Sequence, residues 1–418
     1  MFTHERVGVD TADPVLVARQ VIMDRHRHVF GYELLYRSGA DAGTPDATST
    51  QVATARILCD ALTAIGLDVL TDGKLAFINI DRQTLLNGVP ATLPPERVVF
   101  EFDVDVTPTP DVLAACRELR RQGFSLAINA HPDLAITAGL LPVVDYVKID
   151  SGRPDLDSTT LSGLLTLATH PIVTIAKHVE TQAHFAKSAE LGFNYFQGFF
   201  FGQPVVKEGR AIPGPQLARL KLVQTLQDPN LSIDEIEALI KHDAALCYRV
   251  LRTVNAAVVA HRGAVGSIRE ALLLVGREPI RRWAALLAFA DSSSHAPSEL
   301  LTLSAIRARF CELLAETAGH ADASEAFLMG LCSLLDAILG RPMPDILAEL
   351  PIPDNVRCAL LGENNHLRTV LECATAYGAG EWERAAELAG AAGADQARLQ
   401  TFYVQALRWA RELRAATR

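Results

Sequence analysis

The sequence has little that would tie it to an oxidising compartment or to a membrane. Its seven cysteines are dispersed and form no C-x-x-C pair, which favours reduced thiols over a disulfide framework. No uncharged apolar run reaches the ~18 residues of a membrane span. The first residues, Met1–Asp13, lack the apolar stretch of a signal peptide. We therefore expect a cytoplasmic protein with no membrane insertion.

The chain also has fewer basic than acidic side chains, with 39 lysines and arginines and 49 aspartates and glutamates, so its net charge is −10. A field of this sign repels a nucleic acid polymer, although a local basic pocket could still hold one small phosphoester. Aromatic residues make up 6% of the chain, yet 49% is hydrophobic, which excludes a disordered protein. At roughly 100–200 residues per domain, 418 residues predict two or three domains.

The first half of the chain alternates strand-like and helix-like segments. Runs rich in Val, Ile and Phe lie at Val15–Ile22, Val29–Tyr36, Leu75–Ile80, Val98–Phe102, Ser125–Ile128, Tyr146–Ile149, Ile172–Ala176 and Tyr195–Phe201. Helical spacing separates most of them, as in Ala47–Leu67, Pro110–Gln122, Asp155–Ala168 and Glu180–Leu191. About eight such strands favour an α/β barrel over an open sheet. Neither a G-x-G-x-x-G motif nor a P-loop is present, which weakens a dinucleotide-binding alternative.

The second half reads as entirely helical. Prolines and glycines gather at Pro204–Pro215, which predicts a linker between domains. Beyond it, Ser232 with Glu235 and Ser267 with Glu270 form two capping boxes. Helical spacing continues through Ala284–Asp291, Ser298–Ala318, Ala323–Leu339, Val356–Leu361 and Arg384–Arg414. We expect a barrel over residues 1–205, a linker over 206–215 and an all-α domain over 216–418.

Polar residues end or closely follow the apolar runs of the first half. They are Glu33, Asn79, Glu101, Asn129, Lys148 with Asp150, Glu180 and Gln197. In a parallel α/β barrel the chemistry sits at the carboxyl ends of the strands, so these side chains predict a pocket there. The alternative is that each merely starts a solvated loop.

These residues fall within motifs that resemble the EAL domains, a bacterial family of cyclic-di-GMP phosphodiesterases. The match runs in order over residues 15–205 and rests on Gln20-Val21-Ile22, Glu33-Leu34-Leu35, Asn79, Glu101, Lys148-Ile149-Asp150, Val179-Glu180-Thr181 and Gln197-Gly198. The resemblance implies a TIM-type barrel. It also implies that Glu33, Asn79, Glu101 and Glu180 are remnants of a metal site, and that Lys148 corresponds to a lysine that positions water.

The departures from the family pattern bear on hydrolysis. Asn129-Ala130 stands where active members carry two metal-binding aspartates, and Val104 stands where they carry a second glutamate. The glycine-rich loop is replaced by His131-Pro132-Asp133-Leu134. Mg²⁺ and Mn²⁺ prefer anionic oxygen ligands, which the side chains of Asn129 and Ala130 do not supply. We therefore expect no cofactor, with Mg²⁺ or Mn²⁺ required only if residual phosphodiesterase activity exists.

Loss of the metals does not remove the pocket. Gln20, Arg37 and Gln197 align with groups that hold the phosphate or the bases of cyclic-di-GMP in relatives. Arginine suits a phosphate because its planar fork donates two hydrogen bonds. In the competing interpretation Arg37 forms a structural ion pair and the pocket is vestigial.

Residues 216–290 resemble the start of an HDOD domain, a relative of the HD phosphohydrolases, and 298–418 continue it less distinctly. Metal-binding relatives carry His-Asp where this chain has Cys332-Ser333. His242-Asp243 fits a helix start better than a metal site, and Cys332 fits a buried apolar position. We interpret Arg281-Arg282-Trp283 as helix-surface arginines around a packed tryptophan. The helical half thus resembles an interaction module for signalling proteins.

Together, the two resemblances imply a tandem EAL–HDOD signalling protein with a degenerate EAL domain. The first hypothesis is a non-catalytic adaptor or cyclic-di-GMP receptor, in families that act in motility and biofilm regulation. The second is a weak metal-dependent phosphodiesterase that uses Glu33, Asn79, Glu101, Glu180 and Lys148. Partners, oligomeric state and domain orientation do not follow from the sequence.

Overall fold

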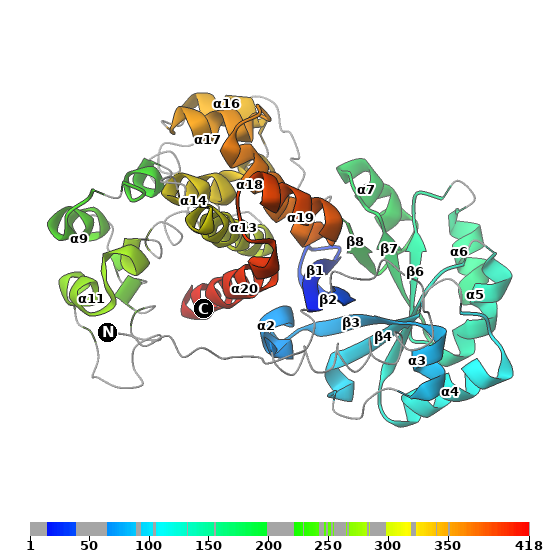
Figure 1. Cartoon of the computed structure of the whole chain (residues 1–418). Coiled ribbons are helices and arrows are strands. Elements are labelled where there is room, and N and C mark those ends of the chain that lie inside the picture. Colours follow the sequence, from blue (N-terminus) through cyan, green and yellow to red (C-terminus); the bar gives the residue numbers. More distant parts are fainter. Residues whose placement is uncertain are drawn as a thin grey trace.

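A computed structural model shows that eight strands close into one barrel, as the sequence predicts (Figure 1). It describes residues 15–38, 65–198 and 221–417, except for 89–92, 103–105, 132, 154–155, 229, 242–245, 248–249, 252–253, 255–264, 266, 282–283, 285–297, 319–322, 340 and 350–351. The strands are β1 (Val15–Asp24), β2 (Val29–Ser38), β3 (Leu75–Ile80), β4 (Val98–Phe102), β5 (Ser125–Asn129), β6 (Tyr146–Asp150), β7 (Val173–Lys177) and β8 (Tyr195–Gln197). From β2 to β8 neighbouring strands run parallel, whereas β1 is antiparallel to both β2 and β8.

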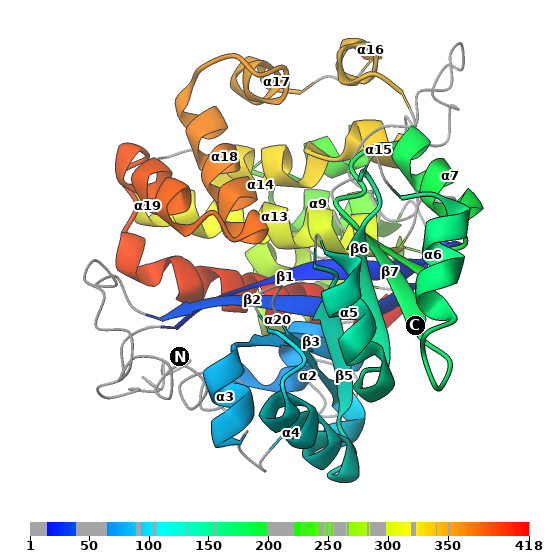
Figure 2. The same cartoon turned by 90° about the vertical axis from the view of Figure 1, so that its right-hand side faces the viewer.

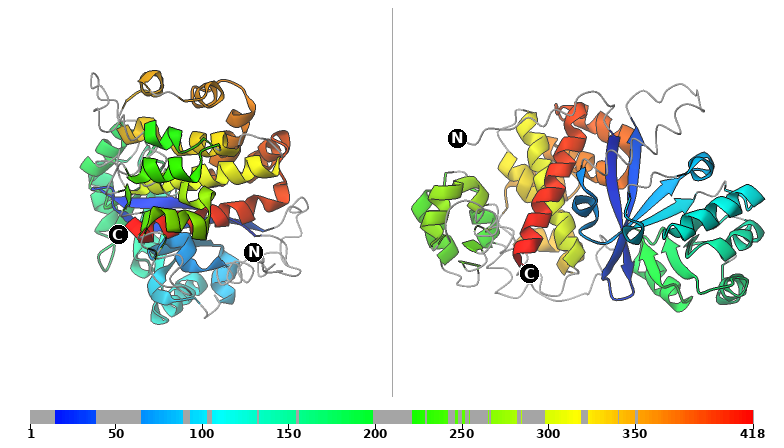
Figure 3. Two further views of the ribbon diagram at one scale, coloured as in Figure 1. Left: turned by 90° about the vertical axis from the view of Figure 1, so that its left-hand side faces the viewer. Right: turned by 90° about the horizontal axis from the view of Figure 1, so that it is seen from below.

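Strands β1 and β2 form a hairpin that reaches beyond the barrel. The Asp24 carboxylate fixes its turn by accepting from the backbone N–H groups of His26 (2.7 Å) and His28 (2.9 Å). Only Ile22–Asp24 pairs with β8 and only Gly31–Leu34 pairs with β3. The rest of the hairpin lies between the barrel and the helical half, where β1 contacts α18 and α20 (Figure 3).

Helices on the outside of the barrel follow the strands (Figure 2). They are α2 (Leu67–Thr71), α3 (Arg82–Asn87), α4 (Pro110–Arg121), α5 (Leu134–Leu140), α6 (Ser158–Leu165) and α7 (Gln182–Glu190), with 3₁₀ turns at Pro95–Arg97 and Leu141–Val143. Asp81, Asp157 and Thr181 begin α3, α6 and α7 because each side chain caps a backbone N–H of the first turn. Most of the predicted helix Ala47–Leu67 lies outside the described residues.

The described part of the second half is helical and contains no strand, as predicted. Its helices are α9 (Ile233–Lys241), α11 (Ile268–Val275), α13 (Ser298–Thr317), α14 (Ala323–Cys332), α15 (Leu335–Leu339), α16 (Met343–Glu349), α17 (Asp354–Leu360), α18 (His366–Ala379), α19 (Trp382–Ala391) and α20 (Leu399–Thr417). The first capping box forms in both directions, since the Ser232 hydroxyl accepts from the N–H of Glu235 and the Glu235 carboxylate accepts from the N–H of Ser232. At the second, the Ser267 hydroxyl accepts from the N–H of Glu270.

Two predicted helices are broken in the structure. The segment Ala323–Leu339 divides at Ser333, whose hydroxyl donates back to the carbonyl of Gly330. The segment Arg384–Arg414 divides where Gly393 adopts a left-handed conformation (φ 75°) and Asp395 caps a new 3₁₀ turn. Helical spacing alone does not reveal these breaks, because the residues on either side keep the same apolar pattern.

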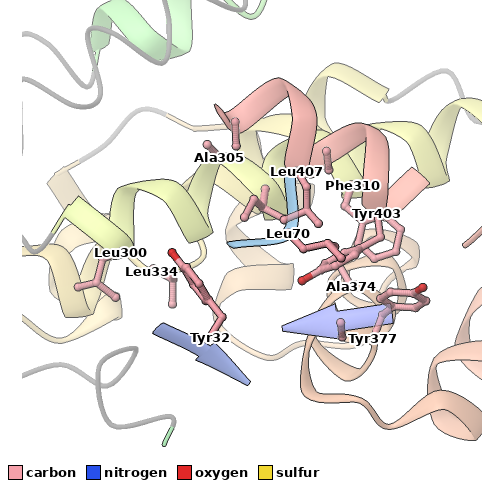
Figure 4. Close-up of a cluster of buried hydrophobic side chains, with 14 of the residues drawn as sticks. Tyr32, Leu70, Leu300, Ala305, Phe310, Leu334, Ala374, Tyr377, Tyr403 and Leu407 are labelled. Atoms are coloured by element: carbon pink, nitrogen blue, oxygen red, sulfur yellow. The ribbon is translucent and has the colours of Figure 1, made fainter. Parts of the chain in front are cut away.

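The hairpin and the helical half share one hydrophobic core. Tyr32 of β2, Leu300 and Phe310 of α13, and Tyr403 of α20 pack into it (Figure 4). The Tyr32 hydroxyl donates to Glu299 (2.9 Å). Among the described residues, no helix is both long and apolar enough to cross a membrane. The predicted linker 206–215 lies outside the described residues.

Candidate functional site

Strand residues from around the barrel bring their polar side chains together inside its carboxyl end. We call this set the barrel-mouth cluster: Gln20, Glu33, Asn79, Glu101, Asn129, Lys148, Lys177 and Gln197. Parallel strands place successive inward-facing positions at one height in a barrel, which explains the convergence. The structure therefore assembles most of the polar strand-end residues that the sequence singles out.

Glu33 is the hub of the cluster. Its carboxylate accepts hydrogen bonds from Asn79 Nδ2 (2.7 Å), Lys148 Nζ (2.7 Å) and Gln197 Nε2 (2.6 Å). Gln197 also donates to Gln20 (2.7 Å), while its own carbonyl oxygen has no hydrogen-bond partner among the described residues. Burial alone would raise the pKa of Glu33, but Lys148 and these donors lower it to about 2. Glu33 is therefore an ionised, fully engaged carboxylate.

Lys148 lies between two buried carboxylates. Its ammonium is fully buried and forms ion pairs with both Glu33 and Glu101. Burial opposes the charged lysine, yet the two carboxylates raise its pKa above the ordinary value. Burial and the nearby charge of Glu33 raise the pKa of Glu101, against the pull of Lys148. Lys148 thus serves as a counter-ion of the cluster, and two of its three N–H donors are directed at carboxylates.

Asn129 closes the other side of the cluster. Its amide nitrogen donates to Glu101 (2.8 Å), and its carbonyl oxygen accepts from the ammonium of Lys177 at 2.5 Å. Lys177 is the last residue of β7, and His178 after it holds a left-handed backbone (φ 55°), which costs a non-glycine residue roughly 1–2 kcal/mol. The sequence-based reasoning missed Lys177, although it occupies the same strand-end position as the residues that were chosen.

Several predicted residues do not join the cluster. Glu180 is exposed, beyond the end of β7. Asp150 accepts from the backbone of Gly152 (2.9 Å) and faces His178 (3.2 Å). Ala130 contributes a backbone N–H to the carbonyl of Lys148 (2.8 Å). The side chain of Arg37 lies outside the described residues, so its predicted role stays a prediction.

The cluster does not fit a divalent cation. Two carboxylates, Glu33 and Glu101, are matched by two ammonium groups, Lys148 and Lys177, so its formal charge is zero. Nowhere in the described part of the chain do three His, Cys, Asp or Glu side chains form a group that could hold a metal. A hard cation would have to displace an ammonium from ligands that are already engaged.

In the helical half, the described residues that the sequence singles out do not form a cluster of this kind. Cys332 is buried, and burial raises its pKa to about 12, so its thiol stays protonated, consistent with an apolar role. The interpretation of Arg281 as a helix-surface arginine is wrong, because its side chain is buried and donates to the carbonyl of Gln227 (3.1 Å) and to Glu278 (2.8 Å). His242-Asp243 lies outside the described residues.

Comparisons with known proteins identify both halves. Residues 20–204 match the EAL domain family and residues 212–345 match the HDOD domain family. The Vibrio cholerae protein named "Cyclic di-GMP phosphodiesterase CdgJ" is 30% identical over 407 residues, 97% of this chain and 94% of that protein. The Bacillus subtilis protein YuxH is 30% identical over 408 residues, 96% of this chain and 98% of that protein. The structure of Klebsiella pneumoniae BlrP1 in a manganese/cy-diGMP complex at pH 6 shares 20% identity with a TM-score of 0.38, covering 45% of this chain and 55% of that one.

Proposed function

The chain belongs to the family of proteins that join an EAL domain to an HDOD domain, and we propose that it acts in cyclic-di-GMP signalling without hydrolysing that molecule. In this proposal the barrel is a receptor or scaffold, and the helical half engages signalling proteins. The observation that carries the proposal is the pair of lysines, Lys148 and Lys177, that neutralise the barrel-mouth cluster.

The chemistry of phosphodiester hydrolysis explains why this observation matters. Hydrolysis near neutral pH by a metal mechanism needs an activated water and cations that stabilise the developing negative charge. Asn129 has its carbonyl oxygen occupied by Lys177, and Ala130 has no ligand atom in its side chain. We therefore derive no metal-dependent step for this barrel.

Ligand binding without turnover remains compatible with the same geometry. The carbonyl oxygen of Gln197 is an acceptor without a partner among the described residues, next to Gln20. An acceptor of this kind suits an N–H donor such as that of a guanine base or a water that bridges to one. We propose Gln20, Arg37 and Gln197 as the ligand-binding residues.

The alternative is a weak phosphodiesterase that uses Glu33, Asn79, Glu101, Glu180 and Lys148. It is favoured by the name of the Vibrio cholerae relative. Two features of this chain weigh against it. Glu180 is exposed outside the cluster, and Lys148 is fully buried with two of its three N–H donors directed at carboxylates.

The test is a calorimetric titration of the full chain with cyclic-di-GMP, with and without Mn²⁺, followed by chromatography of the products. We expect no linear dinucleotide in either condition. Saturable binding that is weakened by Gln197→Ala identifies a receptor, and absence of binding identifies a scaffold. Linear product that forms catalytically with Mn²⁺, and that Glu33→Ala abolishes, would establish the phosphodiesterase instead.

A further inference from the structure

A cavity lies between the β1–β2 hairpin and the helical half. Its volume is about 290 Å³, and its walls come from β1 and β2 on one side and from α13, α18, α20 and the α14–α15 junction on the other. Ligand pockets are commonly about 300–1,000 Å³. The cavity is therefore large enough for a small organic molecule only.

Most of the wall is apolar. Leu300, Leu303, Ile306, Phe310 and Leu334 line it from the helical side. Figure 4 shows Leu300 and Leu334 of this wall near Tyr32. Such a lining favours an apolar ligand body, because each buried methylene group contributes about 0.8 kcal/mol.

One charged pair at the cavity is already satisfied. Arg19 donates to the carbonyl of Leu70 (2.8 Å) and lies 3.7 Å from the carboxylate of Glu299. Tyr32 also donates to Glu299, and the Arg19 guanidinium stacks 4.2 Å from the centre of the Tyr32 ring. These groups leave no net charge for a ligand to balance.

Arg307 is different. The structure gives its guanidinium a single hydrogen bond among the described residues, a long one of 3.4 Å to the hydroxyl of Ser333. Asp336 also lines the cavity; burial raises its pKa, while the charge of Arg307 opposes that shift, and the two side chains form no hydrogen bond or ion pair with each other. Burial likewise lowers the pKa of Arg307, which means that its charged form is held at a cost.

A second hollow shares Arg307 with the cavity, and the other two arginines that line it form ion pairs with carboxylates. It has a volume of about 410 Å³ and is lined also by Arg368 and Arg384. Those two guanidinium groups are paired with Glu372 (2.7 Å) and Glu381 (3.1 Å). Among the described residues, Arg307 therefore differs from Arg368 and Arg384 in that no carboxylate forms an ion pair with its guanidinium.

We propose that this interdomain cavity binds a small organic carboxylate, with its anionic head on Arg307 and its apolar body against Leu303 and Ile306. A guanidinium matches the two oxygens of a carboxylate with two parallel hydrogen bonds. The ligand touches both halves of the chain, and Gln20 lines the cavity while it accepts from Gln197 in the barrel mouth.

The test uses octanoate as the probe, titrated calorimetrically into the full chain. We expect saturable binding of one octanoate per chain, and at least tenfold weaker binding of octan-1-ol and of octylamine. Arg307→Met should weaken octanoate binding at least tenfold. The matched control is Arg309→Met on the same helix, because Arg309 is paired with Glu312 (2.6 Å), and it should leave octanoate binding unchanged.

A second variant tests the cavity itself and does not depend on Arg307. A Cβ atom placed on Gly378 of α18 meets no atom within 4 Å, and Gly378 lines the cavity, so Gly378→Leu should fill it and abolish octanoate binding. The proposal is overturned if octanoate does not bind the folded wild-type chain. It is overturned equally if Gly378→Leu and Arg307→Met, both folded by circular dichroism, bind octanoate as tightly as wild type.

Discussion

The barrel mouth and the interdomain cavity differ in how their cations are paired. In the barrel mouth, Lys148 lies between Glu33 and Glu101, and Lys177 is bonded to Asn129. In the cavity, Arg307 has one long hydrogen bond to Ser333. A cluster that satisfies its own charges has little to gain from a cation, whereas a cation with spare donors gains from an anion. The location of unsatisfied charge, more than the presence of charged residues, indicates where this chain accepts a ligand.

The largest effect that we expect is on the free energy of unfolding when Lys148 or Arg307 is replaced by an apolar residue. Lys148→Met leaves two carboxylates buried around one apolar side chain and should lower the free energy of unfolding by about 3–5 kcal/mol. Arg307→Met removes a charge with one weak partner and should change that free energy by less than about 1 kcal/mol. Urea unfolding followed by circular dichroism measures both. Equal losses of stability in the two variants would contradict the claim that Lys148 and Arg307 differ in how they are paired.

A triple variant refines this result. Lys148→Met combined with Glu33→Gln and Glu101→Gln removes all three charges together. Because the penalty of Lys148→Met arises from unpaired carboxylates, the triple variant should recover more than half of the lost stability. No recovery would mean that the lysine stabilises the barrel by packing alone.

The next effect is a dependence on pH. The folded pKa of Glu33 is about 2 against an ordinary 4.5, so its contribution to stability is present above pH 4.5 and is lost as the pH falls toward 2. The raised pKa of Glu101 has the opposite effect on stability. It lowers the free energy of unfolding at pH values above the ordinary 4.5 and has little effect below them. Between pH 4.5 and 3, the free energy of unfolding of the wild type should therefore fall by about 1–2 kcal/mol more than that of the triple variant. Urea unfolding at each pH measures this difference. If the free energies of unfolding of the two proteins fall by the same amount over this interval, the ion-pair assignment is contradicted.

The smallest effect concerns open space in the helical half. Gly378→Ala places a methyl group in the cavity and removes a glycine from α18, and it should raise the free energy of unfolding by about 0.5–1 kcal/mol. The control is Gly330→Ala in α14, whose new Cβ would lie 2.6 Å from the backbone oxygen of Arg307 and should destabilise the chain. Thermal unfolding compares the two. Destabilisation by both variants would show that the cavity is not open at Gly378.

The residues of the barrel mouth can largely be predicted from the sequence, because each one lies at the end of a strand that the sequence reveals. Alternating segments reveal eight strands, and parallel strands bring their ends together, so Glu33, Asn79 and Glu101 can be expected to meet. Lys177 shows the weak point of this reasoning. The motif match draws attention to Glu180, three residues further on, whereas the strand-end rule leads to Lys177 first.

The cavity could not be predicted from the sequence. Arg307 lies within a helix in which Arg309 and Glu312 form an ordinary pair three residues apart, and nothing in the spacing separates Arg307 from them. Its position in the cavity wall arises because a hairpin near the start of the chain packs against α18 and α20 and reaches α13 through Glu299. Gly330 permits the close packing of α14 on α13, which places Ser333 beside Arg307. Contacts of this kind depend on the packed structure.

The central claim, that the barrel mouth is neutralised by its own lysines, is tested most directly by titrating Mn²⁺ into the full chain and measuring the heat. The account predicts no saturable binding to wild type at Mn²⁺ concentrations up to about 1 mM, the weak end of protein sites for divalent cations. It also predicts that Asn129→Asp combined with Lys177→Glu creates such binding. Stoichiometric Mn²⁺ binding by wild type that Glu101→Gln abolishes would contradict the account.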